Sequence, residues 1–257
     1  MLDNISVLRA LLLVIVTIFA TPLCLAGEYL ITTAHKKDGE VVPYILNYTS
    51  LTPRYLIILF PGGAGNMDPR LVEGKLVYGF KGNFVIRTRK FIIDNEFATV
   101  ATNASQSEER IQALLDDLKG RFPAAQIYLM STSKGTFDSM RLAGYLADKV
   151  AGVIHTSSLD HVASFDARKY KNRQLVVHHR RDNCRATPFH AAQSAHDRYG
   201  TELLVMEGGI SVGDLCEPLA HHGFNGIERE TIAAIKQWIK KGSATGDPLN
   251  ASSGTRR

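Results

Sequence analysis

Short apolar runs alternate with amphipathic segments along most of this chain. The apolar runs are residues 55–60, 97–101, 126–130, 150–155, 174–178 and 202–206. Runs of this length that end at polar or turn residues are typical of strands buried on both faces of a sheet. Apolar residues at helical spacing lie between and after them, in residues 107–121, 136–149, 188–199 and 226–241. The alternation predicts an α/β fold, in which a mostly parallel central sheet carries helices on both faces.

The two flanks of this pattern differ from its centre. Residues 27–48 mix short apolar runs with turn residues, which predicts one or two edge strands. Residues 242–257 contain few apolar side chains, so we expect a disordered tail after a single domain of residues 27–241. Residues 156–173, between two expected strands, are too few for a large lid, which predicts an open site at the carboxyl ends of the strands.

The first 26 residues resemble a secretory signal peptide. An apolar run from Leu11 to Ala20 follows a short polar start, and the small residues Cys24 and Ala26 fit cleavage after Ala26. The run is short for a spanning helix of ~20 residues, although an uncleaved anchor stays an alternative. Cys24 would suit a lipoprotein, but the residues before it match the small-residue box poorly. We therefore expect residues 1–26 to be removed from a periplasmic or extracellular protein that has no other membrane association.

Composition and charge narrow the class of protein. The 257 residues are 45% hydrophobic and 21% charged, which fits one globular domain and excludes a membrane bundle or a disordered chain. The net charge is +5 and the pI about 9.1, but the basic residues are scattered among acidic ones. No basic run is interleaved with aromatic residues, so we expect no nucleic-acid partner. The oligomeric state does not follow from these features.

The strongest chemical signal is the segment STSKGT at residues 131–136. An expected strand ends there and a helix begins at once, which places Ser133 at the tip of a sharp turn. Such a turn strains the backbone and needs small residues two positions away on each side, here Ser131 and Gly135. The usual pattern is G-x-S-x-G, so Ser131 replaces a glycine. Ser133 is the candidate nucleophile, and a helix N-cap is the alternative.

A glycine-rich segment, PGGAG at residues 61–65, follows the first buried strand. Glycines let backbone N–H groups point into a site without an obstructing side chain. We assign an oxyanion hole to the N–H groups of Gly63 and Lys134, with Ala64 as the alternative to Gly63. A plain turn is the other interpretation. A phosphate loop is disfavoured, because neither Gly-Lys-Ser/Thr nor the G-x-G-x-x-G spacing is present.

The candidate acid is Asp182, which follows a buried strand within four residues and precedes a helix. Asp160 and Asp214 also lie in late loops but are less well placed. Asp182 could instead be a turn residue, or pair with Arg181 or Arg185.

The candidate base is His222, in the segment His221-His222-Gly-Phe just before the last helix. A histidine in this loop can reach over the ends of the strands, and His221 is then spare. A solvated loop histidine is the alternative. The chain order of Ser133, Asp182 and His222, with the first two each after a strand, favours a catalytic triad.

Two cysteines, Cys184 and Cys216, remain after removal of the signal segment. In an oxidising compartment they favour one disulfide that closes a loop of about 30 residues. A metal pair or two free thiols are the alternatives, although neither cysteine has further ligands at metal-binding spacing.

Taken together, these motifs resemble the α/β-hydrolase family over nearly all of residues 40–241. They are similar to a group of bacterial exported serine hydrolases that have a Gly-Thr-Ser-Arg-Gly-Thr-like nucleophile elbow, here STSKGT. That group has Asp-x-Cys after the acid strand and a cysteine before His-Gly-Phe, which correspond here to Asp182-Asn-Cys184 and Cys216 before His222. The resemblance implies a Cys184–Cys216 disulfide that braces the acid loop against the histidine loop. The departures are Ser131 for glycine and Pro61 for the usual histidine of the oxyanion loop, and neither removes a catalytic side chain.

The resulting prediction is a serine hydrolase that cleaves an ester or related acyl bond of a small molecule, without a cofactor or metal. Ser133, His222 and Asp182 would act through an acyl-enzyme. An acyltransferase with the same triad is one alternative. A non-catalytic exported binding protein on the same scaffold is the other.

Overall fold

The computed structural model describes residues 27–241 and 249–250. The expected signal segment lies outside the described residues and stays a prediction. Within the expected tail, residues Leu249–Asn250 form a short strand, β11, beside β10 (Glu202–Met206). The expectation of disorder for the other tail residues is likewise outside the described part.

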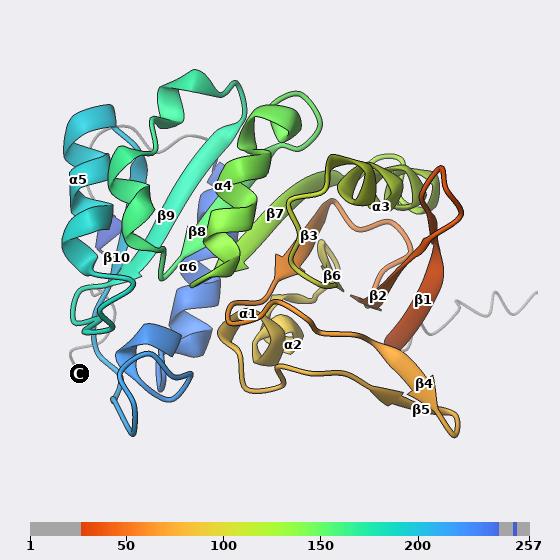
Figure 1. The fold of residues 1–257 in the computed structure, drawn as a ribbon, viewed down its shortest axis with the longest axis horizontal. Helices are drawn as coiled ribbons and strands as arrows, with labels where there is room; N and C mark the ends of the chain where they lie inside the picture. Colours follow the sequence, from red (N-terminus) through yellow and green to blue (C-terminus); the bar gives the residue numbers. More distant parts are fainter. Residues whose placement is uncertain (1–26, 242–248, 251–257) are drawn as a thin grey trace, which may run out of the picture.

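A nine-stranded sheet forms the centre of the molecule (Figure 1). The strands that precede β10 in it are β1 (Gly27–His35), β2 (Val41–Tyr48), β3 (Tyr55–Phe60), β6 (Phe97–Ala101), β7 (Gln126–Thr132), β8 (Gly152–Thr156) and β9 (Arg173–His179). Their order is β1-β2-β6-β3-β7-β8-β9-β10-β11. Among the described strands of this sheet, β2 alone runs opposite to the others: its pairs with β1 and β6 are antiparallel, and the remaining pairs are parallel. The sheet is thus mostly parallel, as the sequence predicts.

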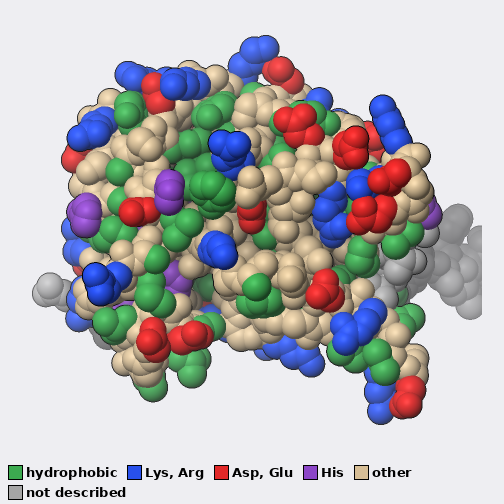
Figure 2. All heavy atoms as spheres, viewed as in Figure 1, with side chains coloured by type: hydrophobic (Ala, Val, Ile, Leu, Met, Phe, Trp, Pro, Cys, Tyr) green, Lys and Arg blue, Asp and Glu red, His purple; other side chains and the backbone are tan. Residues whose placement is uncertain are grey.

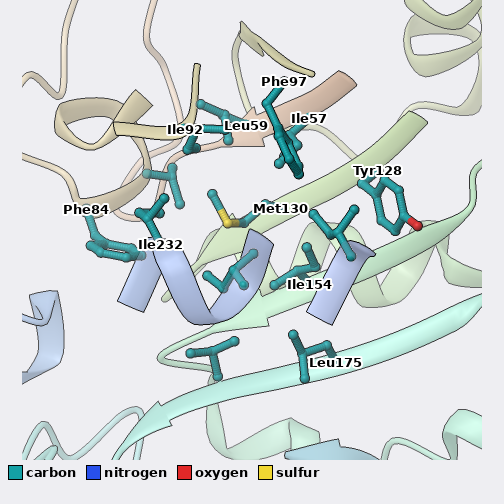
Figure 3. Close-up of a cluster of buried hydrophobic side chains, with 14 of the residues drawn as sticks. Ile57, Leu59, Phe84, Ile92, Phe97, Tyr128, Met130, Ile154, Leu175 and Ile232 are labelled. Atoms are coloured by element: carbon teal, nitrogen blue, oxygen red, sulfur yellow. The ribbon is translucent and has the colours of Figure 1, made fainter. Parts of the chain in front are cut away.

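Helices cover both faces of the sheet. One face carries α3 (Glu108–Arg121), α4 (Gly135–Leu146) and α5 (Phe189–Tyr199). The other carries α1 (Phe84–Arg87), α2 (Arg89–Ile92) and α6 (Glu228–Lys241). Alternate residues of each buried strand face the two layers: Ile57 and Leu59 belong to the α6 side, and Ile58 to the α3 side. Figure 3 shows the α6-side core, where Ile232 of α6 lies near Met130 of β7 and Phe84 of α1.

The main elements follow from local chemistry. All six residues of β3 are buried, as expected for a strand covered on both faces. Helix α3 begins after Ser107, whose Oγ accepts a hydrogen bond from the Arg110 N–H at 3.2 Å, and two glutamates occupy its first turn. Helix α4, expected at 136–149, begins one residue earlier and ends at Leu146, because the chain turns sharply at both ends.

Two segments carry structure that the apolar pattern does not predict. Residues 66–96 form a small hairpin, β4 (Arg70–Val72) and β5 (Lys75–Val77), and then the short helices α1 and α2. Residues between β8 and β9 form two short 3₁₀ turns, η1 (Asp160–Ser164) and η2 (Ala167–Lys169), and no large lid.

The surface is mixed in character. On the face seen in Figure 2, basic and acidic side chains are interspersed. Hydrophobic side chains gather at the lower left, over the loop between β10 and α6, where Ile210, Val212, Leu215 and Leu219 are exposed. None of the helices within residues 27–241 is long and apolar enough to cross a membrane.

Candidate active site

Ser133 lies in a strained turn between β7 and α4. Its φ is 52°, in the left-handed region that a residue with a Cβ adopts only at a cost. The Ser133 N–H donates to the Thr156 carbonyl at the end of β8 (3.0 Å), and the Ser133 carbonyl accepts from the Thr136 N–H (2.9 Å). The N-cap of α4 is Lys134, without a side-chain cap, so the Ser133 hydroxyl does not cap this helix.

Glycines let the loop of residues 61–65 pack directly on this turn. A Cβ on Gly135 would lie 2.5 Å from the Pro61 carbonyl oxygen. A Cβ on Gly62 would lie 2.9 Å from both the Ser133 Cβ and the Thr132 carbonyl oxygen. Both distances are shorter than real Cβ contacts, so any side chain at either position would force the loop away from Ser133.

The serine that replaces a glycine in the elbow takes part in a buried polar chain. Ser131 Oγ lies 2.6 Å from Ser139 Oγ, and Ser139 Oγ lies 3.0 Å from His155 Nδ1. His155 Nε2 lies 3.1 Å from Gln174 Oε1, and Gln174 Nε2 donates to Asn172 Oδ1 at 2.7 Å. The Gln174 oxygen must therefore accept from His155 Nε2, which leaves His155 Nδ1 to accept from Ser139. Burial lowers the pKa of His155 to about 4, so the ring is neutral near pH 7.

Asp182 and His222 are in contact, although they are separated by 40 residues in the sequence. His222 Nδ1 lies 3.1 Å from Asp182 Oδ2 and 3.0 Å from Thr187 Oγ1. The Thr187 hydroxyl donates to the same Asp182 oxygen at 3.0 Å, and the Cys184 N–H donates to the other one at 3.0 Å. The ionised Asp182 carboxylate has no proton to donate, and the Thr187 hydroxyl donates its proton to that carboxylate. His222 Nδ1 must therefore carry the proton in these contacts, which leaves Nε2 free to act as a base.

The Asp182 carboxyl is buried and ionised. Burial would raise its pKa, but the hydrogen bonds from His178 and His222 outweigh burial and hold the pKa well below its usual value. His178 Nε2 lies 3.4 Å from Asp182 Oδ2 and 2.9 Å from the Thr187 carbonyl oxygen. His178 is itself fully buried, so its ring forms one wall of the carboxylate's pocket.

The end of β8 connects the turn of Ser133 to the turn of His222, called the histidine turn below. Thr156 accepts from the Ser133 N–H, and the Ser157 hydroxyl donates to the His222 carbonyl at 2.6 Å. Ser133, Ser157 and Asp182 follow the neighbouring strands β7, β8 and β9, whose carboxyl ends lie at one edge of the sheet (Figure 1). Within the described residues the Ser133 hydroxyl has no hydrogen-bond partner, and hydrogen bonds of this kind often tighten only when substrate is bound.

The backbone N–H groups expected to form an oxyanion hole are available as donors. Gly63 has a φ of 60°, and Gly65 closes the turn by donating to the Gly62 carbonyl at 3.1 Å. In the part of the chain that the structure describes, neither the Gly63 N–H nor the Lys134 N–H donates to a protein acceptor. Gly63 follows Gly62, which contacts the Ser133 turn, and Lys134 follows Ser133, so both donors lie close to Ser133.

Cys184 and Cys216 form a disulfide, with their Cα atoms 4.7 Å apart. Cys184 lies two residues after Asp182, and Cys216 lies six residues before His222. The bond therefore joins the loop that carries the acid to the loop that carries the histidine, as the resemblance implies.

The alternative candidates lie elsewhere. Asp160 is exposed and pairs with His161 at 2.9 Å, and Asp214 is exposed and accepts from the Cys216 N–H. His221 stacks on His179, with ring centroids 4.4 Å apart. Of these residues, none contacts His222 through a hydrogen bond.

Three residues that contact Asp182 or His222 were not predicted from the sequence: Thr187, His178 and Ser157. Thr187 precedes a proline at a helix start, and His178 ends an apolar strand, so both positions have ordinary structural explanations. Their role depends on His222, which is 35 residues from Thr187. No group of three or more histidine, cysteine, aspartate or glutamate side chains in the described ranges could hold a metal ion.

No protein-family model matches the sequence, and no curated protein matches it. Among solved structures, the chain is similar to Est1E from Butyrivibrio proteoclasticus, with a TM-score of 0.56, 16% identity and coverage of 84% of this chain and 100% of that chain. It is similar to an alpha-beta serine hydrolase homologue from Coxiella burnetii (TM-score 0.53, 16% identity, coverage 84% and 97%). XC6422 from Xanthomonas campestris, described as an a/b serine hydrolase without lid, gives a TM-score of 0.55 at 12% identity, with coverage of 83% and 97%.

Proposed function

We propose that this chain, which has the α/β-hydrolase fold, is an exported serine hydrolase that cleaves an ester or related acyl bond of a small molecule. Ser133 is the nucleophile, His222 the general base and Asp182 the acid that orients the histidine. The observation that carries the proposal is the buried contact between His222 Nδ1 and Asp182 Oδ2, at the same edge of the sheet as the strained turn of Ser133. Two of the similar structures are described as serine hydrolases, which supports the same reaction class.

The first half of the reaction forms an acyl-enzyme. The Ser133 oxygen attacks the carbonyl carbon of the ester while His222 Nε2 takes the hydroxyl proton. The carbonyl oxygen becomes an oxyanion that accepts hydrogen bonds from the Gly63 and Lys134 N–H groups. Collapse of this intermediate breaks the bond to the alcohol oxygen, which leaves with the proton from His222.

The second half repeats these steps with water. His222 Nε2 takes a proton from water, whose oxygen attacks the acyl carbon, and collapse returns the proton to the Ser133 oxygen and releases the acid. Throughout, the ionised Asp182 stabilises the positive charge on the ring of His222, because its own pKa is held well below the working pH. The buried contacts from Thr187 and His178 keep the carboxylate in place for both steps.

Labelling with a fluorophosphonate tests this function directly. We expect the purified mature protein to form a stoichiometric adduct at Ser133 and to hydrolyse short p-nitrophenyl esters. Ser133→Ala should lose both the adduct and turnover while it keeps the melting temperature within a few degrees. Ser107→Ala, which changes an exposed serine at the start of α3, is the control for labelling. A Ser133→Ala protein with full turnover, or a wild-type protein that resists the probe, would refute the proposal.

Export is a separate part of the proposal. The signal-like segment of residues 1–26 and the disulfide Cys184–Cys216 both support it, since disulfides persist in oxidising compartments. N-terminal sequencing of the protein from a bacterial periplasmic fraction should begin at Gly27. Recovery of the chain only from the cytosol, with Met1 intact, would contradict export.

A further inference from the structure

The side chain of Asn83 turns away from the helix that it precedes. Asn83 is the N-cap of α1, with φ of −57° and ψ of 141°, but makes no side-chain cap hydrogen bond. Asparagine is among the preferred N-cap residues because its side-chain oxygen can accept from the first free N–H groups of a helix. A residue suited to that role that does not perform it must be held in another orientation by its surroundings.

The Asn83 amide is also without a protein partner. Its Oδ1 atom is buried and has no hydrogen bond within the described residues, and the amide nitrogen donates to none of them. An unpaired buried amide oxygen destabilises the folded state, because it has lost its hydrogen bonds to water. The unpaired oxygen shows that no hydrogen bond to the protein fixes the Asn83 amide in this orientation.

The amide lies beside the nucleophile, with only a glycine between them. A Cβ built on Gly62 would lie 3.5 Å from Asn83 Nδ2 and 2.9 Å from the Ser133 Cβ. Both distances are measured from the same point, so the amide nitrogen and the Ser133 side chain are close neighbours. Because Gly62 has no side chain, none separates the amide nitrogen from the Ser133 side chain at this point.

The backbone around Asn83 is fixed on both sides. The Asn83 N–H donates to the Phe80 carbonyl at 2.9 Å, and the Phe80 ring lies 2.8 Å from the place that a Cβ on Gly63 would take. Arg87 donates to the Gly82 carbonyl at 2.8 Å and to the Gly223 carbonyl, in the turn of His222, at 2.7 Å. The segment that carries Asn83 is thus tied to the oxyanion loop through Phe80 and to the histidine turn through Arg87.

We propose that Asn83 Nδ2 donates a third hydrogen bond to the substrate's acyl oxygen as that oxygen becomes an oxyanion on Ser133. This inference rests on the proposed function. A preorganised donor aimed at developing charge acts mainly on the transition state, so its loss lowers kcat more than it changes KM. It also accounts for the missing helix cap, because a side chain that serves the oxyanion cannot turn back onto α1.

The test compares Asn83→Ser and Asn83→Ala with the wild type. Serine is as good an N-cap as asparagine, but its hydroxyl is too short to reach past Gly62. We expect both variants to lose about 10²-fold in kcat, at nearly constant KM. Their melting temperatures should stay the same or rise, because an unpaired buried amide has been removed. Phosphonylation of Ser133 should slow as well, since the phosphoryl oxygen occupies the position of the oxyanion.

Asn47→Ser is the matched control. Asn47 in β2 also has a buried side-chain oxygen without a partner, but it lies away from the nucleophile turn and contacts Gly27 instead. Asn47→Ser should therefore leave kcat unchanged. Rates are expressed per fluorophosphonate-reactive site, so that incomplete folding of a variant does not imitate lost catalysis.

The outcomes separate this inference from the proposed function. If Ser133→Ala abolishes turnover but both Asn83 variants keep the wild-type kcat, the inference is wrong and the hydrolase remains. A structural role for Asn83 would appear as preserved activity in Asn83→Ser, or as a kcat loss that is matched by a lower melting temperature, and either result overturns the inference. If Ser133→Ala keeps its turnover, the proposed function itself fails.

Discussion

Thr187 places one hydroxyl against two members of the proposed triad. It donates to Asp182 Oδ2 and lies 3.0 Å from His222 Nδ1, so the Nδ1 proton of His222 is shared between two oxygens. His178 contacts the same carboxylate oxygen from another side. Asp182 therefore has a fixed orientation before substrate binds, and the tautomer of His222 follows from it.

Replacing Asp182 with asparagine should remove that control. The amide can donate to His222 Nδ1, which favours the tautomer with the proton on Nε2 and takes away the base. We expect kcat to fall by up to about 10⁴-fold, and Thr187→Val to have a smaller effect, because it leaves the carboxylate in place. Steady-state kinetics on a p-nitrophenyl ester gives both values. The matched controls are Asp160→Asn and Asp214→Asn; a greater loss in either one would show that Asp182 is not the acid.

Among the helices and strands, four are connected by the buried polar chain that begins at Ser131. Ser131 lies in β7, Ser139 in α4, His155 in β8 and Gln174 in β9. These elements meet beneath the turn of Ser133. The hydroxyl that replaces the usual glycine of the elbow is therefore used structurally, since it pairs with Ser139.

Ser131→Gly should destabilise the protein even though it restores the commoner elbow sequence. The substitution removes the hydrogen bond to Ser139 and places a glycine in a strand, at a combined cost of about 1–2 kcal/mol. Ser131→Ala isolates the first of these effects and should cost about 1 kcal/mol. Urea unfolding followed by circular dichroism measures both. A Ser131→Gly variant as stable as the wild type would show that the buried polar chain contributes nothing to the free energy of unfolding.

How far the elements could be predicted depends on the range of their contacts. Residues 55–60 and 126–130 could be predicted as strands because all their side chains except that of Gln126 are buried between two helical layers. The hairpin and short helices of residues 66–96 have too few apolar residues in regular spacing to predict. They are ordered by distant contacts, such as that of Arg87 with the Gly223 carbonyl. The three triad candidates could be predicted from chain order and from their places after strands or before the last helix. Thr187 could not, because its hydroxyl contacts a histidine 35 residues away in another loop.

At the scale of the whole molecule, stability should depend on pH through His155. Its pKa is about 4 in the folded protein because the ring is buried, against about 6.5 in an unfolded chain. Between these values the unfolded chain binds a proton that the folded protein does not, so stability is lost as pH falls from about 6.5 to about 4, by roughly 3 kcal/mol. Burial also lowers the pKa of His179, which acts in the same direction. The depressed pKa of Asp182 stabilises the folded protein at higher pH, and this stabilisation is lost only as pH falls below about 4.

Denaturant unfolding at a series of pH values tests this dependence. The substitution His155→Gln keeps a polar group in the buried polar chain, but the glutamine side chain cannot titrate. The stability of this variant should therefore vary less between pH 6.5 and pH 4 than that of the wild type. His179→Gln measures the share of the second histidine. An unchanged slope in His155→Gln would show that His155 does not limit stability in acid.

The disulfide acts on the whole chain and on the site together. It closes a loop with a sequence separation of 32, so in the chain-entropy model its removal should cost roughly 3–4 kcal/mol. We expect the double variant Cys184→Ala, Cys216→Ala to lose about this much free energy of unfolding and also to lose activity, because the acid and histidine loops are no longer joined. Kinetics on the folded variant separates the two effects. Two alkylatable thiols in native exported protein would show that the bond is absent.

The two sulfurs of this bond have unequal surroundings, which sets how an external thiol can break it. Cys216 is exposed, whereas Cys184 is 2% exposed and lies beside the buried Asp182 carboxylate. We expect an attacking thiolate to reach the exposed Cys216 rather than the buried Cys184, so that the electron pair of the broken bond departs on the Cys184 sulfur. A thiolate there would be poorly hydrated and next to a negative charge, which makes it a poor leaving group. In the folded protein the bond is therefore protected kinetically, and reduction should proceed at the rate at which the chain opens.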